Sequence, residues 1–345
     1  MLAETNDSGI ARQAGRDSDD AALARLHPLA RALVGLTPSL NTPFRADGDV
    51  DLAAVARLVE RTVAAGASGA LVLAVAGEGP YLSETERGAV SETIAEMAAG
   101  RLPIVVSVTA TDLESSLRLA RGAVEVGLTS ICWQPPAGAD LEALLAQLGR
   151  FERAGVELVM VQDLAWGGPG LPLETIVVLH ERAPVFGSIK IETAPAGPKY
   201  SAVLEALDGR LHVAGGWAAS QLLDALERGV HSFMPTAMDD LYFSVISAFR
   251  SGDRDGAQDI FETMLPILAF ANQHIDISIR FFKKLRRLQG LFDTELCRIE
   301  TALDPVQERS AEALVRRAID LDAAAARRNG EARQARRQAG TPWTR

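Results

Sequence analysis

The chain of 345 residues is predicted to fold as a (β/α)8 barrel with additional C-terminal helices. Eight short runs rich in Val, Ile and Leu are each followed by a segment of helical period, over about 220 residues in all. The runs are apolar along their whole length, which is typical of parallel strands buried on both faces. A doubly wound open sheet is the rival fold. The first run, however, leads into Asn41-Thr42-Pro43-Phe44 and not into a glycine-rich phosphate loop.

The order of the expected elements places the barrel over residues 33–252. Strands are expected near residues 33–40, 70–75, 104–108, 130–133, 157–161, 185–191, 211–214 and 232–234. Helices are expected near residues 52–65, 84–99, 113–126, 141–154, 173–183, 202–207, 220–228 and 239–250. Ser83 and Glu86 have the spacing of a capping box, which predicts the start of the second helix.

Segments outside the barrel differ from it in composition. Residues 1–32 are polar, and we expect a flexible N-terminal extension there. Helical periodicity continues over 253–326, which predicts helices packed on the barrel or on a neighbouring subunit. Within this region, Lys283 and Lys284 are expected to be surface charges of an amphipathic packing helix. Residues 327–345 are expected to form a basic tail.

Charge and cysteine content exclude several classes of partner. The chain has 45 acidic and 35 basic residues and a net charge of −10, which argues against nucleic acid or an anionic membrane as a partner. No apolar stretch reaches the length of a membrane span, and the N-terminus lacks the pattern of a secretory signal. Cys132 and Cys297 form no CxxC motif, so neither a disulfide nor a zinc site is expected. We therefore expect a cytoplasmic protein.

Lysine is scarce in this chain, and one of the four lysines lies in a predicted strand. Lys190 lies within the apolar run Val185-Phe186-Gly187-Ser188-Ile189-Lys190-Ile191. Burial favours the neutral amine, which can attack a ketone and form a Schiff base. Glu192 lies two residues further on, so it points to the same face of the strand. A structural ion pair of Lys190 with Glu192 or Asp163 is the alternative interpretation.

The C-terminal ends of barrel strands carry the active site, which directs attention to the residues there. Candidates at these ends are Thr42, Gly77, Glu78, Gln162, Asp163, Gly216 and Thr236. The five histidines form no HxH or HExxH pattern, which argues against a zinc or iron site. A GxSxG nucleophile elbow and a Walker loop are also absent from the sequence.

Several of these motifs together resemble the dihydrodipicolinate synthase / N-acetylneuraminate lyase family. The similar segments are Thr42-Pro43-Phe44 with Asp47-Gly48 and Val50-Asp51, then Gly77-Glu78 with Leu82-Ser83-x-x-Glu86-Arg87, and Lys190 after Ser188-Ile189. The resemblance covers about residues 34–320. It implies that Lys190 forms a Schiff base with pyruvate or another 2-oxo acid. It also implies a homo-oligomer, a dimer or a tetramer. No metal or organic cofactor is expected, because the lysine itself supplies the electron sink.

The chain departs from the family at the proton relay. Where the family usually has two hydroxyl residues before Gly77-Glu78, this chain has Val75 and Ala76. Where the family usually has a Tyr-Asn pair at the end of the fifth strand, this chain has Gln162 and Asp163. We therefore expect Asp163 and Glu192 to be the candidate acid/base groups.

The substrate contacts follow from the same comparison. Backbone N–H groups of Ala76, Gly77 and Glu78 are expected to hold the substrate carboxylate, with further contacts from Gln162, Thr42, Gly216 and Thr236. The resulting hypothesis is a Schiff-base-forming aldolase, synthase or dehydratase that acts through Lys190. The alternative is a catalytically inactive barrel of the same family that binds a metabolite or a protein partner.

Overall fold

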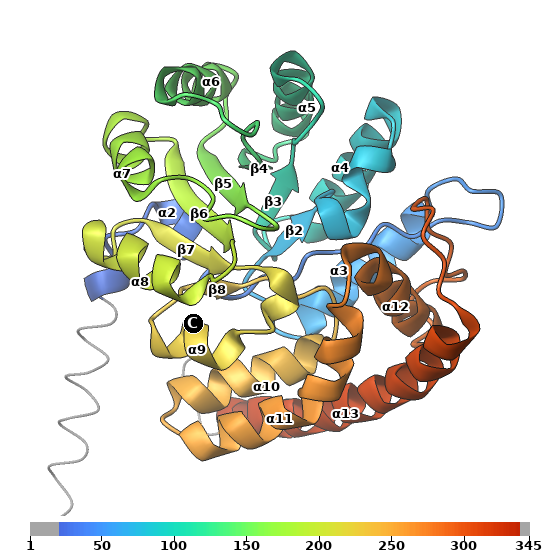
Figure 1. Ribbon diagram of the computed structural model, residues 1–345. Coiled ribbons are helices and arrows are strands. Elements are labelled where there is room, and N and C mark those ends of the chain that lie inside the picture. The colour runs from blue at the N-terminus through green and yellow to red at the C-terminus, as the bar shows by residue number, and fades with distance from the viewer. Residues whose placement is uncertain (1–20, 339–345) are drawn as a thin grey trace, which may run out of the picture.

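Eight parallel strands form one sheet that curls into a barrel, in a computed structural model that describes residues 21–338 (Figure 1). The strands are β1 (Gly35–Leu36), β2 (Ala70–Val72), β3 (Ile104–Ser107), β4 (Ser130–Trp133), β5 (Leu158–Leu164), β6 (Phe186–Glu192), β7 (His212–Gly215) and β8 (Ser232–Phe233). Their order is β1-β8-β7-β6-β5-β4-β3-β2. A parallel bridge between Ser39, just beyond β1, and Leu71 in β2 joins the two ends of this order. The predicted barrel is therefore confirmed.

Helices alternate with the strands and form the outer layer of the barrel (Figure 1). They are α3 (Leu52–Ala64), α4 (Glu84–Ala98), α5 (Leu113–Glu125), α6 (Leu141–Arg153), α7 (Leu173–Arg182), α8 (Gly197–Ala206), α9 (Leu222–Glu227) and α10 (Asp239–Arg250). The capping box of Ser83 and Glu86 is confirmed at the start of α4. Helix α8 begins earlier than expected, because Pro198 lies in its first turn, where the missing N–H of proline removes no helical hydrogen bond.

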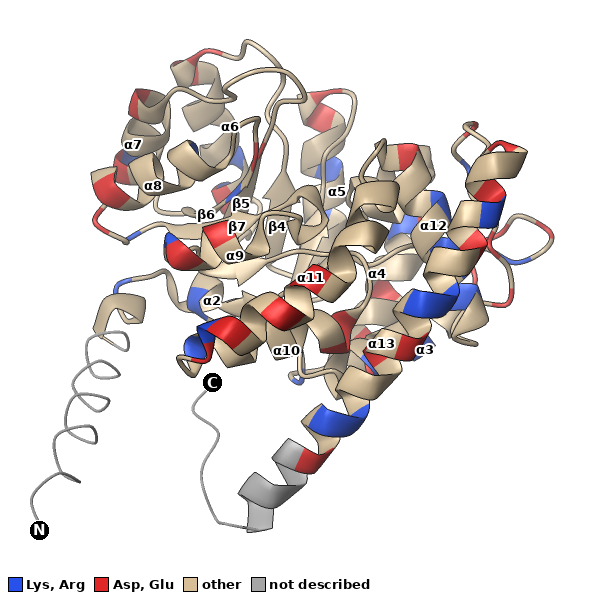
Figure 2. Ribbon diagram, turned by 60° about the horizontal axis from the view of Figure 1, so that its bottom comes forward, with Lys and Arg blue, Asp and Glu red and all other residues tan. Residues whose placement is uncertain are grey.

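Three further helices pack on one side of the barrel (Figure 1). They are α11 (Arg254–Ala271), α12 (Ile275–Leu288) and α13 (Pro305–Gln338). Helix α13 continues past residue 326 into the segment that was expected to form a basic tail. Acidic and basic residues are interspersed along α13, and Figure 2 shows both signs on neighbouring turns. The expected N-terminal extension lies mostly outside the described residues, and its last part forms the short helix α2 (Pro28–Arg31).

Buried apolar side chains fill the barrel interior below the candidate site. Side chains from successive strands meet there, and α2 closes the bottom with Ala30, next to Leu33. The strand side chains of this layer are Leu71, Val105, Cys132, Leu158, Met160 and Ala214. Burial raises the pKa of the Cys132 thiol to about 12, so the thiol stays protonated. Cys132 and Cys297 are both free thiols.

Buried ion pairs attach α13 and α12 to the barrel. Arg61 of α3 lies 2.8 Å from Asp240 of α10 and 2.9 Å from Asp322 of α13. Asp322 also accepts hydrogen bonds from the backbone N–H groups of Asp240 and Leu241. Burial, followed by the nearby charge of Asp239, raises the pKa of Asp322 to about 6. The C-terminal helices are therefore integral to the folded unit.

No helix within residues 21–338 is both long and apolar enough to cross a membrane.

A buried histidine pair at the bottom of the barrel predicts a loss of stability in acid. The rings of His212 and His231 stack at 5.5 Å, and the His231 Nδ1 accepts a hydrogen bond from the Val213 N–H. Burial, together with the charge of Arg250, lowers the pKa of His231 to about 4. Below pH 6.5 the unfolded chain therefore binds a proton that the folded chain rejects.

We expect His231 to contribute about 2 to 3 kcal/mol of destabilisation as the pH falls from 7 to 4. His231→Asn keeps a hydrogen-bond acceptor for Val213 but does not titrate. The free energy of unfolding, measured with urea across this range, should therefore depend less steeply on pH in the variant. Equal slopes in the two proteins would contradict the assignment.

Candidate active site

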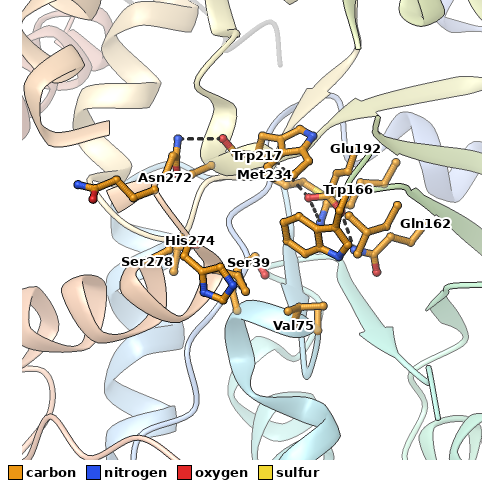
Figure 3. Close-up of a pocket in the computed structure, with 18 residues that line it drawn as sticks. Ser39, Val75, Gln162, Trp166, Glu192, Trp217, Met234, Asn272, His274 and Ser278 are labelled. Atoms are coloured by element: carbon orange, nitrogen blue, oxygen red, sulfur yellow. Dashed lines mark hydrogen bonds and ion pairs between the residues drawn. The ribbon is translucent and has the colours of Figure 1, made fainter. Parts of the chain in front are cut away.

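A cavity of about 300 Å³ opens at the C-terminal ends of the strands, where barrel enzymes bind their substrates (Figure 3). The lining residues come from the strand ends, from the loops after β2, β5 and β7, and from the start of α12. They are Ser39, Ala74, Val75, Ala76, Gln162, Leu164, Trp166, Lys190, Glu192, Trp217, Ala218, Met234, Thr236, Asn272, Gln273, His274, Ile275 and Ser278. Of the residues expected at the site, Lys190, Glu192, Gln162, Ala76 and Thr236 line this cavity.

Lys190 and Glu192 form an ion pair at the base of the cavity. Both belong to β6, two residues apart, and both point into the barrel, as the alternation of strand side chains predicts. The Lys190 Nζ lies 3.1 Å from the Glu192 Oε1. Lys190 is 5% exposed and Glu192 is 9% exposed. The amine therefore reaches the cavity while its side chain is held in the protein interior.

Glu192 connects three adjacent strands. Its Oε2 accepts a hydrogen bond of 2.6 Å from the Gln162 Nε2 of β5, and its Oε1 accepts one of 3.2 Å from the Trp217 N–H after β7. Gly216 permits this approach, since a Cβ at that position would lie 2.1 Å from the Glu192 Oε1. Gly216 itself does not line the cavity, and its role is to leave room for the carboxylate.

Asp163 lies on the opposite face of β5 from the cavity. Gln162 pairs in register with Lys190, so the next residue along the strand points outward. The Asp163 carboxylate forms an ion pair with Lys199 and accepts a hydrogen bond of 2.8 Å from the Leu171 N–H. The structure therefore does not bring Asp163 to Lys190. Lys199 is held in this ion pair and does not line the cavity.

Glu78 is buried away from the cavity and paired with Lys283 of α12. Both side chains are fully buried, and the Lys283 Nζ also lies 4.0 Å from the centroid of the Phe44 ring. The Arg298 N–H donates a hydrogen bond of 2.6 Å to the Glu78 Oε1. Burial lowers the pKa of Lys283, and Glu78 opposes that shift.

Two expectations about these residues are corrected. Glu78 is not placed to contact a substrate, and Lys283 is not a surface charge. The sequence pattern identifies one apolar face of α12. The opposite face is covered by the chain after α12, where the Leu296 carbonyl accepts a hydrogen bond of 2.8 Å from Lys283. Lys284, the neighbouring residue, pairs with Glu308 at 2.6 Å near the surface.

The loop after β2 uses some of its backbone N–H groups internally. Gly77 donates to the Ala74 carbonyl and Glu78 donates to the Val75 carbonyl, each at 3.0 Å, so neither N–H is available to a substrate carboxylate. Val75 and Ala76 line the cavity, and within the described chain their N–H groups have no acceptor. The expected backbone donors are therefore shifted by one to two residues toward the strand.

Thr42 positions this loop and does not line the cavity. Its hydroxyl donates a hydrogen bond of 2.6 Å to the Gly77 carbonyl, and the neighbouring Asn41 amide donates one of 2.7 Å to the Ala76 carbonyl. Thr42 is thus a support of the site and not one of its contacts, which corrects the expectation.

Several lining residues were not identified from the sequence. Trp166 follows β5 and Trp217 follows β7, and their rings meet edge to face with centroids 4.8 Å apart. Asn272, His274 and Ser278 come from the junction of α11 and α12. No sequence motif marks this junction, because only the packing of the C-terminal helices brings it over the barrel mouth.

Among the described residues, no group of three or more His, Cys, Asp or Glu side chains is arranged to hold a metal ion.

The fold is that of a (β/α)8 barrel with a buried lysine at the C-terminal end of its sixth strand. Comparisons with known proteins show which family this chain is similar to. The model of the dihydrodipicolinate synthetase family matches residues 32–137. An L-2-keto-3-deoxyarabonate dehydratase from Azospirillum brasilense is 26% identical over 271 residues, which cover 76% of this chain and 86% of the relative. A 4-hydroxy-tetrahydrodipicolinate synthase from Salinibacter ruber is 34% identical over 161 residues, which cover 45% of this chain and 53% of the relative.

Solved structures show the same fold. A Proteus mirabilis N-acetylneuraminate lyase superposes with a TM-score of 0.74 at 21% identity, covering 83% of this chain and 98% of that chain. A dihydrodipicolinate synthase from Rhodopseudomonas palustris gives a TM-score of 0.73 at 22% identity, with 83% and 98% coverage. The chain is therefore similar to the dihydrodipicolinate synthetase family in sequence, over residues 32–137, and in fold over most of its length. The relatives named above include a dehydratase, a synthase and a lyase.

The buried pair of Glu78 and Lys283 predicts a large effect of removing one partner. Lys283→Met leaves a buried carboxylate without its counter-ion, so we expect a loss of about 3 to 5 kcal/mol in the free energy of unfolding. Lys284→Met, on the same helix, removes an ion pair near the surface, and we expect a loss of about 0 to 1 kcal/mol. Urea unfolding followed by circular dichroism measures both. Equal losses in the two variants would contradict the structural role of Lys283.

Proposed function

We propose that this protein is a Schiff-base-forming lyase that acts on pyruvate or another 2-oxo acid through Lys190. The single observation that carries the proposal is a buried lysine on β6. Its amine borders a cavity and lies 3.1 Å from a buried carboxylate on the same strand face. The similarity to a dehydratase, a synthase and a lyase supports the same reaction class.

The proposed chemistry needs only groups of the chain and water. The Lys190 amine adds to the C2 carbonyl of the oxo acid, and a proton carried by Glu192 lets the C2 oxygen leave as water, which gives an iminium. In cleavage, the C4 hydroxyl gives its proton to Glu192 as the C3–C4 bond breaks, the iminium takes the electron pair, an aldehyde leaves, and the enamine is then protonated at C3. In dehydration, Glu192 takes a C3 proton to give the enamine, which expels the C4 hydroxyl as that proton is returned to it, so water leaves. In both cases addition of water to the iminium returns the amine and releases the 2-oxo product.

Glu192 is the proposed acid/base group. It is the one carboxylate among the lining residues, and it lies beside the amine that gains and loses protons. Gln162 holds its second oxygen at 2.6 Å, which fixes the orientation of the carboxylate. Asp163, on the outer face of β5, is not retained as a candidate.

Backbone groups are the proposed site of the substrate carboxylate. Val75 and Ala76 line the cavity, and their N–H groups have no acceptor in the described part of the chain. Backbone N–H groups are effective carboxylate ligands and need no side-chain hydroxyl. This arrangement agrees with the absence of hydroxyl side chains at these two positions.

The oligomeric state and the cellular location of the protein stay predictions. A dimer or tetramer is expected from the resemblance, and a cytoplasmic location is expected from the lack of targeting signals.

Borohydride trapping tests the nucleophile. We expect intact-mass analysis to show a reduced pyruvate adduct on the wild-type chain and none on Lys190→Arg, because the guanidinium is not a nucleophile at neutral pH. Lys199→Arg is the matched control, since it keeps the charge next to Asp163 and should form the adduct. No adduct with any of a broad panel of 2-oxo acids would favour the alternative, an inactive barrel that binds a metabolite or a protein partner.

A pair of isosteric substitutions tests the acid/base assignment. Glu192→Gln keeps the shape of the side chain but cannot exchange the proton, so we expect kcat to fall about 10²- to 10⁴-fold. Asp163→Asn should retain turnover within a few-fold of wild type, because Asp163 faces away from the cavity. Both variants are compared by steady-state kinetics after circular dichroism confirms folding. Loss of turnover in Asp163→Asn with Glu192→Gln unaffected would reverse the assignment.

A further inference from the structure

The outer part of the cavity is aromatic on one side. Trp166, in the loop after β5, and Trp217, in the short helix η3 (Trp217–Ala219) after β7, meet edge to face near the mouth (Figure 3). Trp166 is 56% exposed, although indole is among the largest apolar side chains. Leu164, Val75 and Met234 continue the apolar lining toward Lys190.

The backbone that carries Trp217 is strained. Trp217, Ala218 and Ala219 have φ angles of 55°, 48° and 54°, a left-handed conformation that costs free energy for residues with a Cβ. Three hydrogen bonds hold this turn. The Trp217 N–H donates to Glu192 at 3.2 Å, the Tyr242 hydroxyl donates to the Ala218 carbonyl at 2.6 Å, and the Asn272 amide donates to the Trp217 carbonyl at 3.4 Å. Strain that is held in this way is concentrated at ligand-binding sites.

The few basic side chains around the cavity disfavour substrates that carry a second anionic group. Lys190 is the one Lys or Arg among the lining residues, and it is already paired with Glu192. The other cations nearby are engaged elsewhere, Lys199 with Asp163 and Lys283 with Glu78. A second carboxylate or a phosphate on the substrate would therefore meet no free lysine or arginine and would lie near the Glu192 carboxylate, and His274 is the one further lining residue that can carry a positive charge.

From these features we propose that the substrate carbonyl compound carries an uncharged aryl group, which binds against Trp166 and Trp217. An aryl ring matches the edge-to-face geometry of the indole pair and the apolar side chains beside it. A polyhydroxylated tail would place hydroxyl groups against indole carbon, and two of the amides near the mouth, Gln162 and Asn272, already have partners in the protein. This inference rests on the proposed function, which supplies the reacting lysine.

The test is a condensation assay with pyruvate and three aldehydes. The enamine of pyruvate adds to the aldehyde carbon, the aldehyde oxygen takes a proton, and water releases the product from Lys190. Benzaldehyde thereby gives 4-hydroxy-4-phenyl-2-oxobutanoate. We expect kcat/KM for benzaldehyde to exceed that for glyceraldehyde and for succinic semialdehyde by about tenfold or more. An equal or reversed order would overturn the inference.

Substitutions show whether the tryptophan produces the preference. Trp166→Ala should lower the ratio of kcat/KM for benzaldehyde to that for glyceraldehyde by about tenfold, and Trp166→Phe should restore most of it. Tyr81→Ala is the matched control, because Tyr81 is 52% exposed on the loop after β2 and does not line the cavity. It should leave the ratio unchanged. An unchanged ratio in Trp166→Ala would overturn the inference.

A binding measurement separates this inference from the proposed function. In Lys190→Arg, which cannot form the adduct, 4-phenyl-2-oxobutanoate should quench tryptophan fluorescence, and 2-oxoglutarate should not. Quenching without any pyruvate trapping in the wild type would support the aryl site and reject the lyase. Trapping without a preference for the aryl compound, in the assay or in the quenching, would support the lyase and reject the aryl site.

Discussion

The Glu192 carboxylate is the constraint on which the arrangement of the barrel mouth depends. It is buried, and a buried carboxylate requires partners for both oxygens. Those partners come from three adjacent strands or their loops: Gln162, Lys190 and the Trp217 N–H. Gly216 has no side chain where the carboxylate passes. The Glu192 carboxylate thus forms an ion pair with the Lys190 amine, accepts a hydrogen bond from the Gln162 amide, and accepts another from the first residue of the strained turn.

A second buried acid brings the C-terminal helices into the same site. Glu78 follows β2 and pairs with Lys283 of α12, so the loop that presents Val75 and Ala76 is attached to a helix outside the barrel. This attachment carries the junction of α11 and α12 over the mouth, where Asn272 holds the Trp217 carbonyl. The helices that follow the barrel therefore contribute a wall of the cavity as well as stability.

Sequence reasoning was most successful where a side chain's direction follows from local periodicity. Lys190 and Glu192 were expected on one face of a strand, and they form an ion pair there. Asp163 was expected near Lys190 because it ends the adjacent strand, at the position of the family's Tyr-Asn pair. Its side depends on the register of β5 against β6, which pairs Gln162 with Lys190 and turns Asp163 outward. Glu78 was expected to hold the substrate carboxylate through its backbone N–H, but that N–H donates to the Val75 carbonyl and the Glu78 side chain pairs with Lys283.

The (β/α)8 barrel, the approximate bounds of most strands and helices, and the position of the lysine on β6 can all be inferred from the amino-acid sequence. They follow from hydrophobic period and strand count, which can be seen along the chain without any long-range contact. The burial of Lys283, the outward direction of Asp163 and the position of Trp166, Trp217 and the start of α12 at the cavity can be seen only in the folded protein. Each of these features depends on contacts between segments that are far apart in the sequence. Such contacts decide which side chains are buried, and the adjacent residues in the sequence do not reveal them.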